Sequence, residues 1–296
     1  MENLQNKQKT YLTDFVIFIL SHENPKVVKT YKSLKRFGYT GNWYIVLDDT
    51  DSCYDEYVER FGKEKILVFN KSDIAKTFDG MDLSTNYDTV VYARNACFEL
   101  ARKLGYNYFM ELDDDYREFN FRFDDNGVFK TLFPTNLDIV FEALLEYYIN
   151  TPKLLTLAIA QMGDFLGGSD SSKYKKRYLR KAMNTFICSV DRPFTFIGRI
   201  NEDVNTYCTL GSRGELIATV VDVSINQIDT QHKVNNSGMS NIYIRDGTYA
   251  KSFYPVICCP SFVKIGIVGN NHARIHHNID WKHAVPMIIS DRFKKV

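Results

Sequence analysis

The sequence predicts an α/β protein whose open, mostly parallel sheet is flanked by helices, because short apolar segments alternate with segments of helical periodicity. The apolar segments that predict buried strands in the first half are residues 14–20, 43–47 and 66–69. A helix is expected to begin near Pro25, which suits a first helical turn, and to end before Gly38. Residues 89–104 have apolar side chains at helical spacing and precede Gly105, a typical helix terminator.

The second half of the chain is less regular and predicts one helix, residues 137–149, among further strands. These strands are expected at residues 154–160, 184–190, 216–223, 256–259 and 263–268. The sequence contains no internal repeat, low-complexity tract or interdomain linker. We therefore expect a single domain over residues 1–296, with an elaborated C-terminal half.

The composition is that of a soluble globular protein, since 45% of the 296 residues are hydrophobic and 25% are charged. No apolar run approaches the roughly 18 residues that a membrane helix needs, and residues 1–10 lack the apolar stretch of a signal peptide. We therefore expect a cytoplasmic protein with no membrane partner. The six cysteines form no CxxC pair, which favours buried free thiols over a zinc site or a disulfide framework.

A strand-like segment, residues 108–112, is followed by three consecutive carboxylates, Asp113, Asp114 and Asp115. Adjacent carboxylates repel one another, so their gathering at a strand end favours a neutralising cation. Hard oxygen ligands suit Mn²⁺ or Mg²⁺, and a divalent ion would in turn hold a diphosphate. A solvated acidic turn is the alternative explanation for such a triplet.

Other polar residues are expected beside the triplet, because parallel strands place their carboxyl ends along one edge of a sheet. Ser21 follows the first strand, and Asp48 and Asp49 end the second. Polar groups at this edge are typical of the nucleotide-binding side of an open α/β sheet. The sequence therefore predicts that these residues contact a nucleotide.

The helix before the triplet makes this prediction more specific. Its Ala93-Arg94-Asn95 segment, followed by Ala101, Gly105, Tyr108 and the Asp triplet, resembles the core of GT-A glycosyltransferases over roughly residues 14–116. The resemblance implies a GT-A-type, Rossmann-like sheet and a nucleotide-sugar donor, for which a UDP-sugar is expected. It also divides the domain into a nucleotide-sugar half, residues 10–116, and an acceptor and catalytic half, residues 117–296.

The same resemblance implies a role for each member of the triplet. Asp113 and Asp115 match the DxD positions, whose carboxylates hold Mn²⁺ or Mg²⁺ on the donor diphosphate. Strand alternation is expected to turn Asp114 to the opposite side. We expect Asp114 to be one of the donor-binding residues.

Four further residues match donor contacts of the GT-A fold. Arg94 and Asn95 match helix positions that contact the diphosphate or the sugar, and Asp48 or Asp49 matches the position that holds uridine or ribose. The alternatives are a surface ion pair for Arg94 and an ordinary turn for the Asp48-Asp49 pair.

Glu202 and Asp203 stand at the start of a helix-like segment. In inverting GT-A enzymes an acidic residue at this point of the fold is the general base, which takes the proton from the acceptor hydroxyl. The resemblance favours Asp203 as the base and Glu202 as its alternate. Two carboxylates in a first helical turn would also be favourable without any catalytic role.

The C-terminal segment, residues 269–277, is dense in polar groups, and GT-A enzymes often complete their metal site with a C-terminal histidine. His272 is the first choice for the third metal ligand, and His276 or His277 the second. His232 precedes the segment 233–240, which would suit a lid over the donor. A purely structural histidine is the alternative in each case.

Residues 173–181 carry six positive charges in nine positions, with tyrosines between them. Interleaved cations and aromatic rings are typical of a surface that contacts a nucleic-acid backbone, and a solvated helix face is the alternative. The predicted nucleic-acid contacts are Lys173, Lys175, Lys176, Arg177, Arg180 and Lys181. Because the net charge is only +1, any affinity for DNA would depend on this local patch.

Residues 180–210 resemble a narrower family, the TET/JBP-associated glycosyltransferases, which are related to the base J glucosyltransferase. The matching segments are residues 181–186, 192–198 and 201–203. The resemblance implies transfer to hydroxymethylated pyrimidines in DNA, by enzymes that bacteriophages often carry, and hence a host cytoplasm. A base in a duplex would have to be made accessible before it could react, for example by flipping.

Two other functions stay open at this point. The chain could be a GT-A transferase for a carbohydrate or another small acceptor, or an inactive module that binds a nucleotide-sugar or a nucleic acid. The sequence favours an inverting enzyme, but it does not fix the anomeric outcome, the sugar or the oligomeric state.

Overall fold

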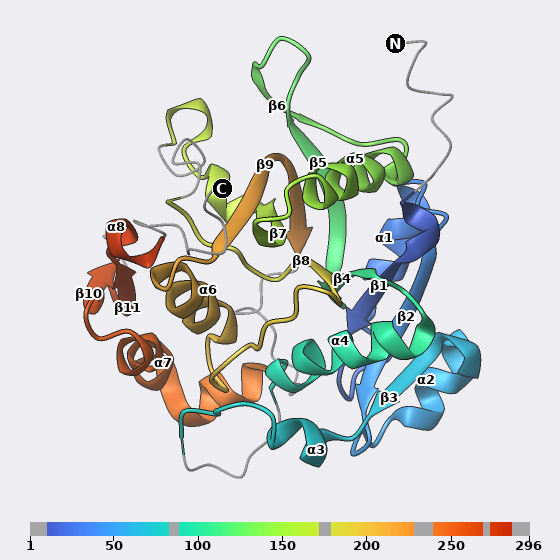
Figure 1. The fold of residues 1–296 in the computed structure, drawn as a ribbon, viewed down its shortest axis with the longest axis horizontal. Helices are drawn as coiled ribbons and strands as arrows, with labels where there is room; N and C mark the ends of the chain where they lie inside the picture. Colours follow the sequence, from blue (N-terminus) through green and yellow to red (C-terminus); the bar gives the residue numbers. More distant parts are fainter. Residues whose placement is uncertain (1–10, 83–88, 172–178, 228–238, 269–272, 286–296) are drawn as a thin grey trace, which may run out of the picture.

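The centre of the computed structural model is a nine-stranded mixed sheet (Figure 1). The structure describes residues 11–82, 89–171, 179–227, 239–268 (backbone alone for 239–248) and 273–285. The strand order is β3-β2-β1-β4-β8-β7-β9-β5-β6. The N-terminal strands are β1 (Phe15–Leu20), β2 (Asn42–Asp48), β3 (Ile66–Phe69) and β4 (Tyr108–Asp113). Their pairings are all parallel, which confirms the predicted α/β class and its parallel N-terminal strands.

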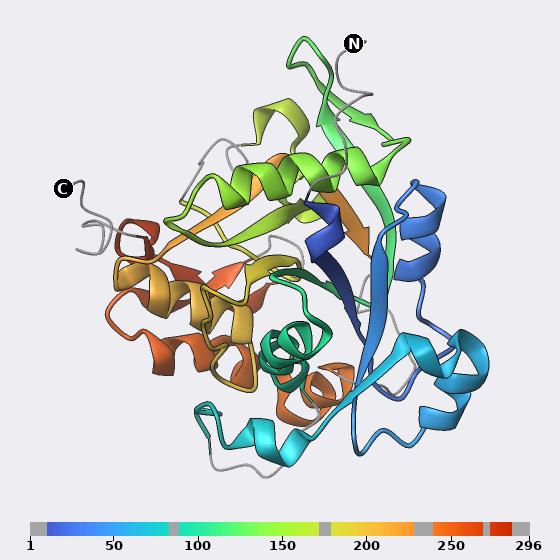
Figure 2. The ribbon, with the colours of Figure 1, turned by 45° about the vertical axis from the view of Figure 1, so that its right-hand side comes forward.

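The sheet is covered on both faces, as the side chains of β1 show. Phe15 and Ile17 belong to the core beneath α1, α2 and α5, whereas Val16 and Phe18 belong to the core beneath α4 and α6, because strand side chains alternate between faces. All of β1 is buried, which explains its continuous apolar sequence. Figures 1 and 2 show these helices on the two faces; they are α1 (Thr30–Arg36), α2 (Tyr54–Phe61), α3 (Lys71–Ala75), α4 (Val91–Leu104), α5 (Leu137–Ile149) and α6 (Glu202–Ser212).

The second half of the sheet brings two more strand ends to the rim on which β1, β2 and β4 end. Its strands are β5 (Tyr116–Phe123), β6 (Phe129–Leu132), β7 (Leu154–Gln161), β8 (Phe186–Ser189) and β9 (Leu216–Gln227). Because β8 is antiparallel to both β4 and β7, those two strands run in the same direction, and β9 is parallel to β7. The carboxyl ends of β4, β7 and β9 therefore share one rim, where open α/β sheets bind their ligands.

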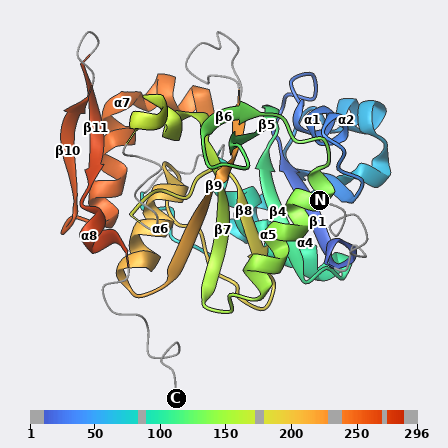
Figure 3. The same cartoon turned by 90° about the horizontal axis from the view of Figure 1, so that it is seen from above.

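A C-terminal unit packs outside the main sheet. It consists of α7 (Met239–Cys258), the antiparallel hairpin of β10 (Val263–Val268) and β11 (Arg274–Ile279), and α8 (Trp281–Ala284). Both α7 and α8 contact α6, and α7 contacts β11. Figure 3 shows this unit beside α6, at the opposite end of the molecule from α1 and α2.

Two sequence-based expectations about these elements are wrong. The first helix begins at Thr30 rather than near Pro25, because the N–H groups of Lys29 and Thr30 both donate to the Asp114 carbonyl and fix its start there. Residues 256–258 end the helix α7 instead of forming a strand, since an apolar run of four residues does not distinguish a strand from a helical turn. The sequence also failed to indicate β5, β6 and β11.

All six cysteines are free thiols, and four of them are buried. Within the described ranges, no helix combines the length and the apolar character needed to cross a membrane.

Candidate active site

The Asp triplet lies where β4 ends. Asp113 is the last residue of the strand, and Asp114 and Asp115 make the turn into β5. Ser21 Oγ, at the end of β1, donates to Asp114 Oδ2 over 2.5 Å. The ends of β1 and β4 therefore lie together at one rim, as predicted, and the Asp114 side chain is turned toward Ser21.

Arg94 on α4 binds three carboxylates from two other elements. Its Nη1 lies 3.2 Å from Glu111 and its Nη2 3.1 Å from Asp113, both on β4. Its Nε donates to Glu202 on α6 over 3.1 Å. Arg94 is only 1% exposed, so this guanidinium joins the end of β4 to the start of α6 inside the protein. The alternative of a surface ion pair is therefore wrong.

The carboxylates around Arg94 outnumber the positive charge that it supplies. We call Glu111, Asp113, Glu202 and Asp203 the carboxylate centre. Burial raises the pKa of Asp113 to about 7, against the Arg94 charge and with the help of the Asp115 and Asp114 charges. Burial likewise raises the pKa of Glu111 to about 8. The protein therefore holds a surplus of carboxylates at this point. Their mutual repulsion costs free energy, and a bound divalent cation would reduce that cost.

The side chains that could bind such a cation fit it only in part. Asp113 lines the cavity described below, whereas Asp115 is 5% exposed and does not belong to its wall. Within the part of the chain that the structure describes, no three His, Cys, Asp or Glu side chains are grouped to hold a metal. Carboxylate oxygens at Asp113 suit Mn²⁺ or Mg²⁺, and the remaining ligands would come from water, from a donor diphosphate or from residues outside the described ranges.

Asn95, next to Arg94 on α4, positions the loop that leads to Glu202. Its amide Nδ2 donates to the Phe196 carbonyl over 2.9 Å, and its Oδ1 accepts the Phe196 N–H over 2.8 Å. Both hydrogen-bonding atoms of this amide therefore contact the backbone of the loop. The geometry gives Asn95 a positioning role and no support to the predicted donor contact.

The end of the same loop fixes the start of α6. Gly198 has φ +80°, and a Cβ there would lie 2.3 Å from Asn205 Nδ2, so glycine is required on both counts. Asn201 is left-handed (φ 54°, ψ 44°), a conformation that asparagine tolerates better than most residues. Its side-chain amide donates to the Lys251 carbonyl on α7. Glu202 and Asp203 thus enter the first turn of α6 from a rigid connection.

Glu202 and Asp203 are buried and differ in their contacts. Burial raises the pKa of both carboxyl groups, and the neighbouring Asp203 charge raises that of Glu202 further. Glu202 is held by Arg94, whereas one Asp203 oxygen accepts the Val204 N–H over 2.7 Å. The charges of Arg94, Lys181 and Lys251 partly offset the effect of burial on the pKa of Asp203.

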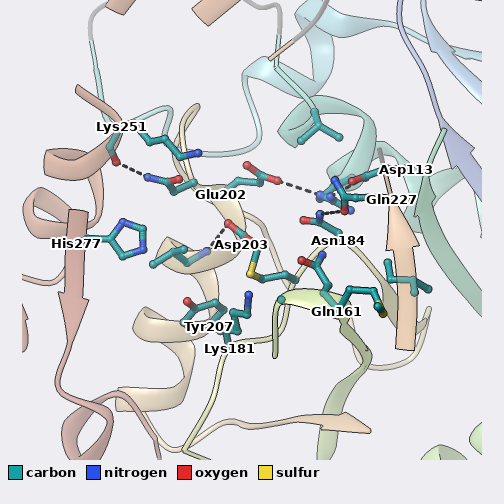
Figure 4. A pocket seen from close by; sticks show the side chains of 18 of the residues that line it. Asp113, Gln161, Lys181, Asn184, Glu202, Asp203, Tyr207, Gln227, Lys251 and His277 are labelled. Atoms are coloured by element: carbon teal, nitrogen blue, oxygen red, sulfur yellow. Dashed lines mark hydrogen bonds and ion pairs between the residues drawn. The ribbon is translucent and has the colours of Figure 1, made fainter. Parts of the chain in front are cut away.

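A cavity of about 510 Å³ connects the carboxylate centre with the ends of β7 and β9 and with the C-terminal unit. Figure 4 shows Asp203 near its middle, with Asp113 on one side and His277 on the other. Five carboxamides form part of its wall: Gln161, Asn184, Asn201, Asn226 and Gln227. A volume of this size suits a small-molecule ligand.

Basic residues line parts of the cavity that lie away from Asp113 (Figure 4). We call Lys181, Lys251, His276 and His277 the basic wall. Burial lowers the pKa of Lys251, although the nearby Asp203 charge opposes that effect. Burial also lowers the pKa of His277 to about 4, with His276, Lys251 and Lys181 adding to it.

Asp48 and Asp49, the predicted nucleotide contacts, lie at the end of β2 outside this cavity. Asp48 is buried, with Lys71 Nζ at 3.3 Å and His22 Nδ1 at 2.9 Å from its Oδ2. Asp49 accepts hydrogen bonds from Asn70 Nδ2 and from the Lys71 N–H, at the start of α3. Contact of either residue with a nucleotide stays a prediction.

The predicted nucleic-acid contacts fall into three groups. Lys173, Lys175, Lys176 and Arg177 lie outside the described residues. Arg180 has a side chain only 5% exposed and an ion pair with Asp164 at 2.8 Å, so in this structure it cannot face a DNA backbone. Lys181 lines the cavity.

The predicted metal-binding histidines receive no support. His272, and the proposed lid residue His232, lie outside the described residues. Of the second choices, His277 lies across the cavity from Asp113, beyond Glu202 and Asp203 (Figure 4). It is therefore not placed to complete a site on Asp113.

Sequence reasoning overlooked Lys71 and Lys251. Lys71 follows β3 much as Asp49 follows β2, so the strand-end argument could have found it. No local signal marks Lys251, which lies in a helix with an ordinary pattern and reaches the cavity only because α7 packs on α6.

A family model described as TET-Associated Glycosyltransferase matches residues 15–236, which is most of the chain. The chain belongs to this family. The resemblance inferred from the sequence is thereby confirmed, and so is its coarse function as a glycosyltransferase. The family match contains the whole carboxylate centre and Lys181, and it ends before α7.

Solved structures with a similar chain course resemble this TET-associated glycosyltransferase only distantly. Glucosyl-3-phosphoglycerate synthase from Mycobacterium tuberculosis, in complex with Mg²⁺ and uridine-diphosphate, is 9% identical with a TM-score of 0.44, over 90% of this chain and 87% of that chain. S. aureus TarS is 14% identical with a TM-score of 0.44, over 73% of this chain and 37% of that chain. No curated protein matches the sequence.

Proposed function

We propose that this TET-associated glycosyltransferase moves a sugar from a nucleotide-sugar, preferably a UDP-sugar, to the hydroxyl of a hydroxymethylpyrimidine base in DNA. The observation that carries the proposal is the cavity that Asp113 of β4 and Asp203 of α6 share, in a chain of this family. Asp113 is placed to serve the donor and Asp203 to serve the acceptor. Arg94 fixes the spacing between β4 and α6 because it contacts both Asp113 and Glu202.

On the donor side, Asp113 would hold Mn²⁺ or Mg²⁺, with Asp115 as the second DxD carboxylate. A bound divalent ion would neutralise the charge that develops on the leaving diphosphate. Ser21, Asp114 and Asp48 or Asp49, along the same rim, would contact the nucleotide. Arg94 supports this side by orienting Asp113, because its buried guanidinium is held in place by three carboxylates.

On the acceptor side, Asp203 would act as general base. As the acceptor oxygen forms its bond to the anomeric carbon, the bond from that carbon to the diphosphate oxygen breaks, and the hydroxyl proton passes to Asp203. A carboxylate whose pKa is raised by burial is better matched to this transfer at neutral pH than an ordinary one. Glu202 is the weaker candidate because Arg94 holds it. Attack from the face opposite the leaving group would invert the anomeric carbon.

The family name supports a DNA acceptor, as does the basic run that ends at Lys181. Because such an acceptor is intracellular, we place the protein in the cytoplasm, which would be a host cytoplasm for a phage-encoded enzyme. The cavity is too small for a duplex, so the reacting base would enter it unstacked.

The proposal is tested by incubating the full chain with Mn²⁺, a panel of sugar nucleotides and DNA containing 5-hydroxymethylpyrimidines. The DNA is then digested to nucleosides, whose masses are measured. We expect one nucleoside to gain the mass of a single glycosyl unit with one donor, and no gain with Asp203→Asn. Turnover of the donor without modification of any DNA would instead indicate a carbohydrate or other small acceptor.

A further inference from the structure

The basic wall is built largely by a part of the chain that lies beyond the family match. The match ends at residue 236, whereas Lys251, His276 and His277 belong to the C-terminal unit. They nonetheless line the same cavity as Asp113 and Asp203. The chain therefore adds basic groups to the cavity from outside the segment that defines its family.

These groups are held on a rigid unit rather than at the tips of loops. Ser252 Oγ, next to Lys251, donates to the Ile275 carbonyl over 3.0 Å and so ties α7 to β11. His276 and His277 pair across the hairpin with Gly266 and Ile265 of β10. The Asn201 amide joins the Lys251 backbone to the start of α6. Lys251 and the two histidines are thus fixed relative to Asp203.

The two sides of the cavity have opposite electrostatic needs. The carboxylate centre has surplus negative charge around Arg94, which suits a cation and the diphosphate that it carries. Away from Asp113, the charge of Arg274 adds to those of Lys181 and Lys251 and acts on both Lys251 and His276. His277 Nδ1 is buried there without a hydrogen-bond partner among the described residues. This side therefore suits an anion that also accepts hydrogen bonds.

The position of the basic wall beyond Asp203 indicates which substrate brings that anion. The proposed function assigns the donor diphosphate to Asp113, and a neutral carbohydrate hydroxyl would need no cluster of cations. A nucleotide in a DNA strand brings a phosphodiester a few ångströms from its base, and lysine and histidine side chains bind phosphate oxygens well.

Resting on the function proposed above, we propose that the basic wall, through Lys251 and His277, binds a backbone phosphate of the acceptor nucleotide while the flipped base of that nucleotide faces Asp203. The C-terminal unit then makes the enzyme select a nucleotide within a strand over a free nucleoside or a neutral sugar.

The experiment compares two acceptors that differ in their phosphates: the free 5-hydroxymethylpyrimidine nucleoside, and a trinucleotide with that nucleoside in the middle. The wild type should have a KM at least about 10-fold lower for the trinucleotide, since a hydrogen bond to a charged group contributes about 1.5–3 kcal/mol. Lys251→Met and His277→Gln should each remove most of that preference while the donor KM stays unchanged. Lys251→Arg should retain it.

Matched controls come from the same unit. Lys264 on β10 and His283 on α8 are exposed and lie away from the cavity, so Lys264→Met and His283→Gln should keep the wild-type preference. With longer single-stranded DNA, Lys251→Met should reduce the steepness of log affinity against log salt by about 0.7, because one lysine–phosphate pair is lost. The two control variants should keep the wild-type slope.

Three results would overturn the inference while leaving the proposed function intact. One is a wild type that modifies DNA but uses nucleoside and trinucleotide equally well. Another is a Lys251→Met variant whose donor KM rises instead, which would assign the wall to the diphosphate. The third is a change in kcat and its pH profile alone, which would mean that Lys251 serves only to keep Asp203 ionised. A wild type that transfers to no DNA at all contradicts the proposed function itself.

Discussion

The two sides of the cavity were built in different ways. On the β4 side most polar groups contact one another: Arg94 holds Glu111, Asp113 and Glu202, and Ser21 holds Asp114, although one buried Glu111 oxygen has no hydrogen-bond partner among the described residues. On the C-terminal side, His277 keeps a buried ring nitrogen that no described residue hydrogen-bonds, beside two lysines. The first side is a preorganised centre, whereas on the second side the His277 ring nitrogen is placed to hydrogen-bond a ligand.

The difference also concerns how each side tolerates change. A buried charge network is strongly coupled, so removing one member leaves other charges uncompensated in the interior. The basic wall is more open, so removing one member should weaken the binding of a ligand more than it weakens the fold. Substitutions on the β4 side should therefore affect both catalysis and stability.

Replacing Asp113 with alanine should have the largest effect and abolish metal-dependent donor turnover, because the variant has no carboxylate at this point of the cavity wall. Turnover with Mn²⁺ and a UDP-sugar measures it, with Asp125→Ala, an exposed residue of the β5–β6 turn, as the control. Asp115→Ala should be equally inactive if both DxD positions hold the ion. Unchanged activity of Asp113→Ala would remove the basis of the donor site.

Asp203→Asn should lower kcat by about 10²–10⁴-fold, the usual contribution of a general base, and leave donor binding nearly intact. Single-turnover rates and calorimetric titration with the nucleotide separate the two quantities. Loss of donor binding in this variant would instead identify Asp203 as a structural residue. Glu202→Gln provides the comparison on the neighbouring carboxylate.

Arg94→Met should lower the free energy of unfolding by about 3–5 kcal/mol, the usual cost of removing one partner from a buried ion network. Chemical denaturation measures it, and Arg102→Met is the matched control, because Arg102 is an exposed residue of the same helix. Equal stability of the two variants would show that the network around Arg94 contributes little.

Neutralising Lys175, Lys176 and Arg177 together should weaken DNA binding and flatten its salt dependence, by up to about 0.7–0.9 in slope for each phosphate that these side chains neutralise. Fluorescence anisotropy at several salt concentrations measures both effects. The KM for the free nucleoside should not change. DNA binding indistinguishable from wild type would leave the basic wall as the main phosphate-binding surface.

The smallest effect is expected in the dependence of stability on pH. Burial alone would raise the pKa of Asp48, but contacts with His22, Thr50 and Lys71 lower it below its ordinary value. A carboxyl group with a lowered pKa stabilises the folded state above its unfolded pKa of about 3.9, and that contribution disappears as the pH falls further. The free energy of unfolding of the wild type should therefore fall between about pH 5 and pH 2. Asp48→Asn should show a shallower fall, and Asp125→Asn the wild-type one.

The arrangement of elements on the β4 side of the cavity could be predicted largely from the sequence. A strand that ends in Asp113, a helix with Arg94 before it and a later acidic pair are local patterns, and the parallel-strand rule places their ends together. The sequence could not predict that Arg94 would pair with Glu111 and Glu202 at the edge of the cavity. Those contacts depend on how α4 and α6 pack on the same face of the sheet.

The sequence by itself determined the α/β class, the gathering of polar residues where parallel strands end, and the family. Strand periodicity, strand ends and motif spacing are all properties of neighbouring residues. Only the tertiary structure decided that Lys251 and His277 complete the cavity. A helix and a hairpin outside the main sheet have no fixed relation to its rim until they pack, here through the contacts of α7 and α8 with α6. The position of the basic wall is therefore a result of long-range packing, which no local pattern encodes.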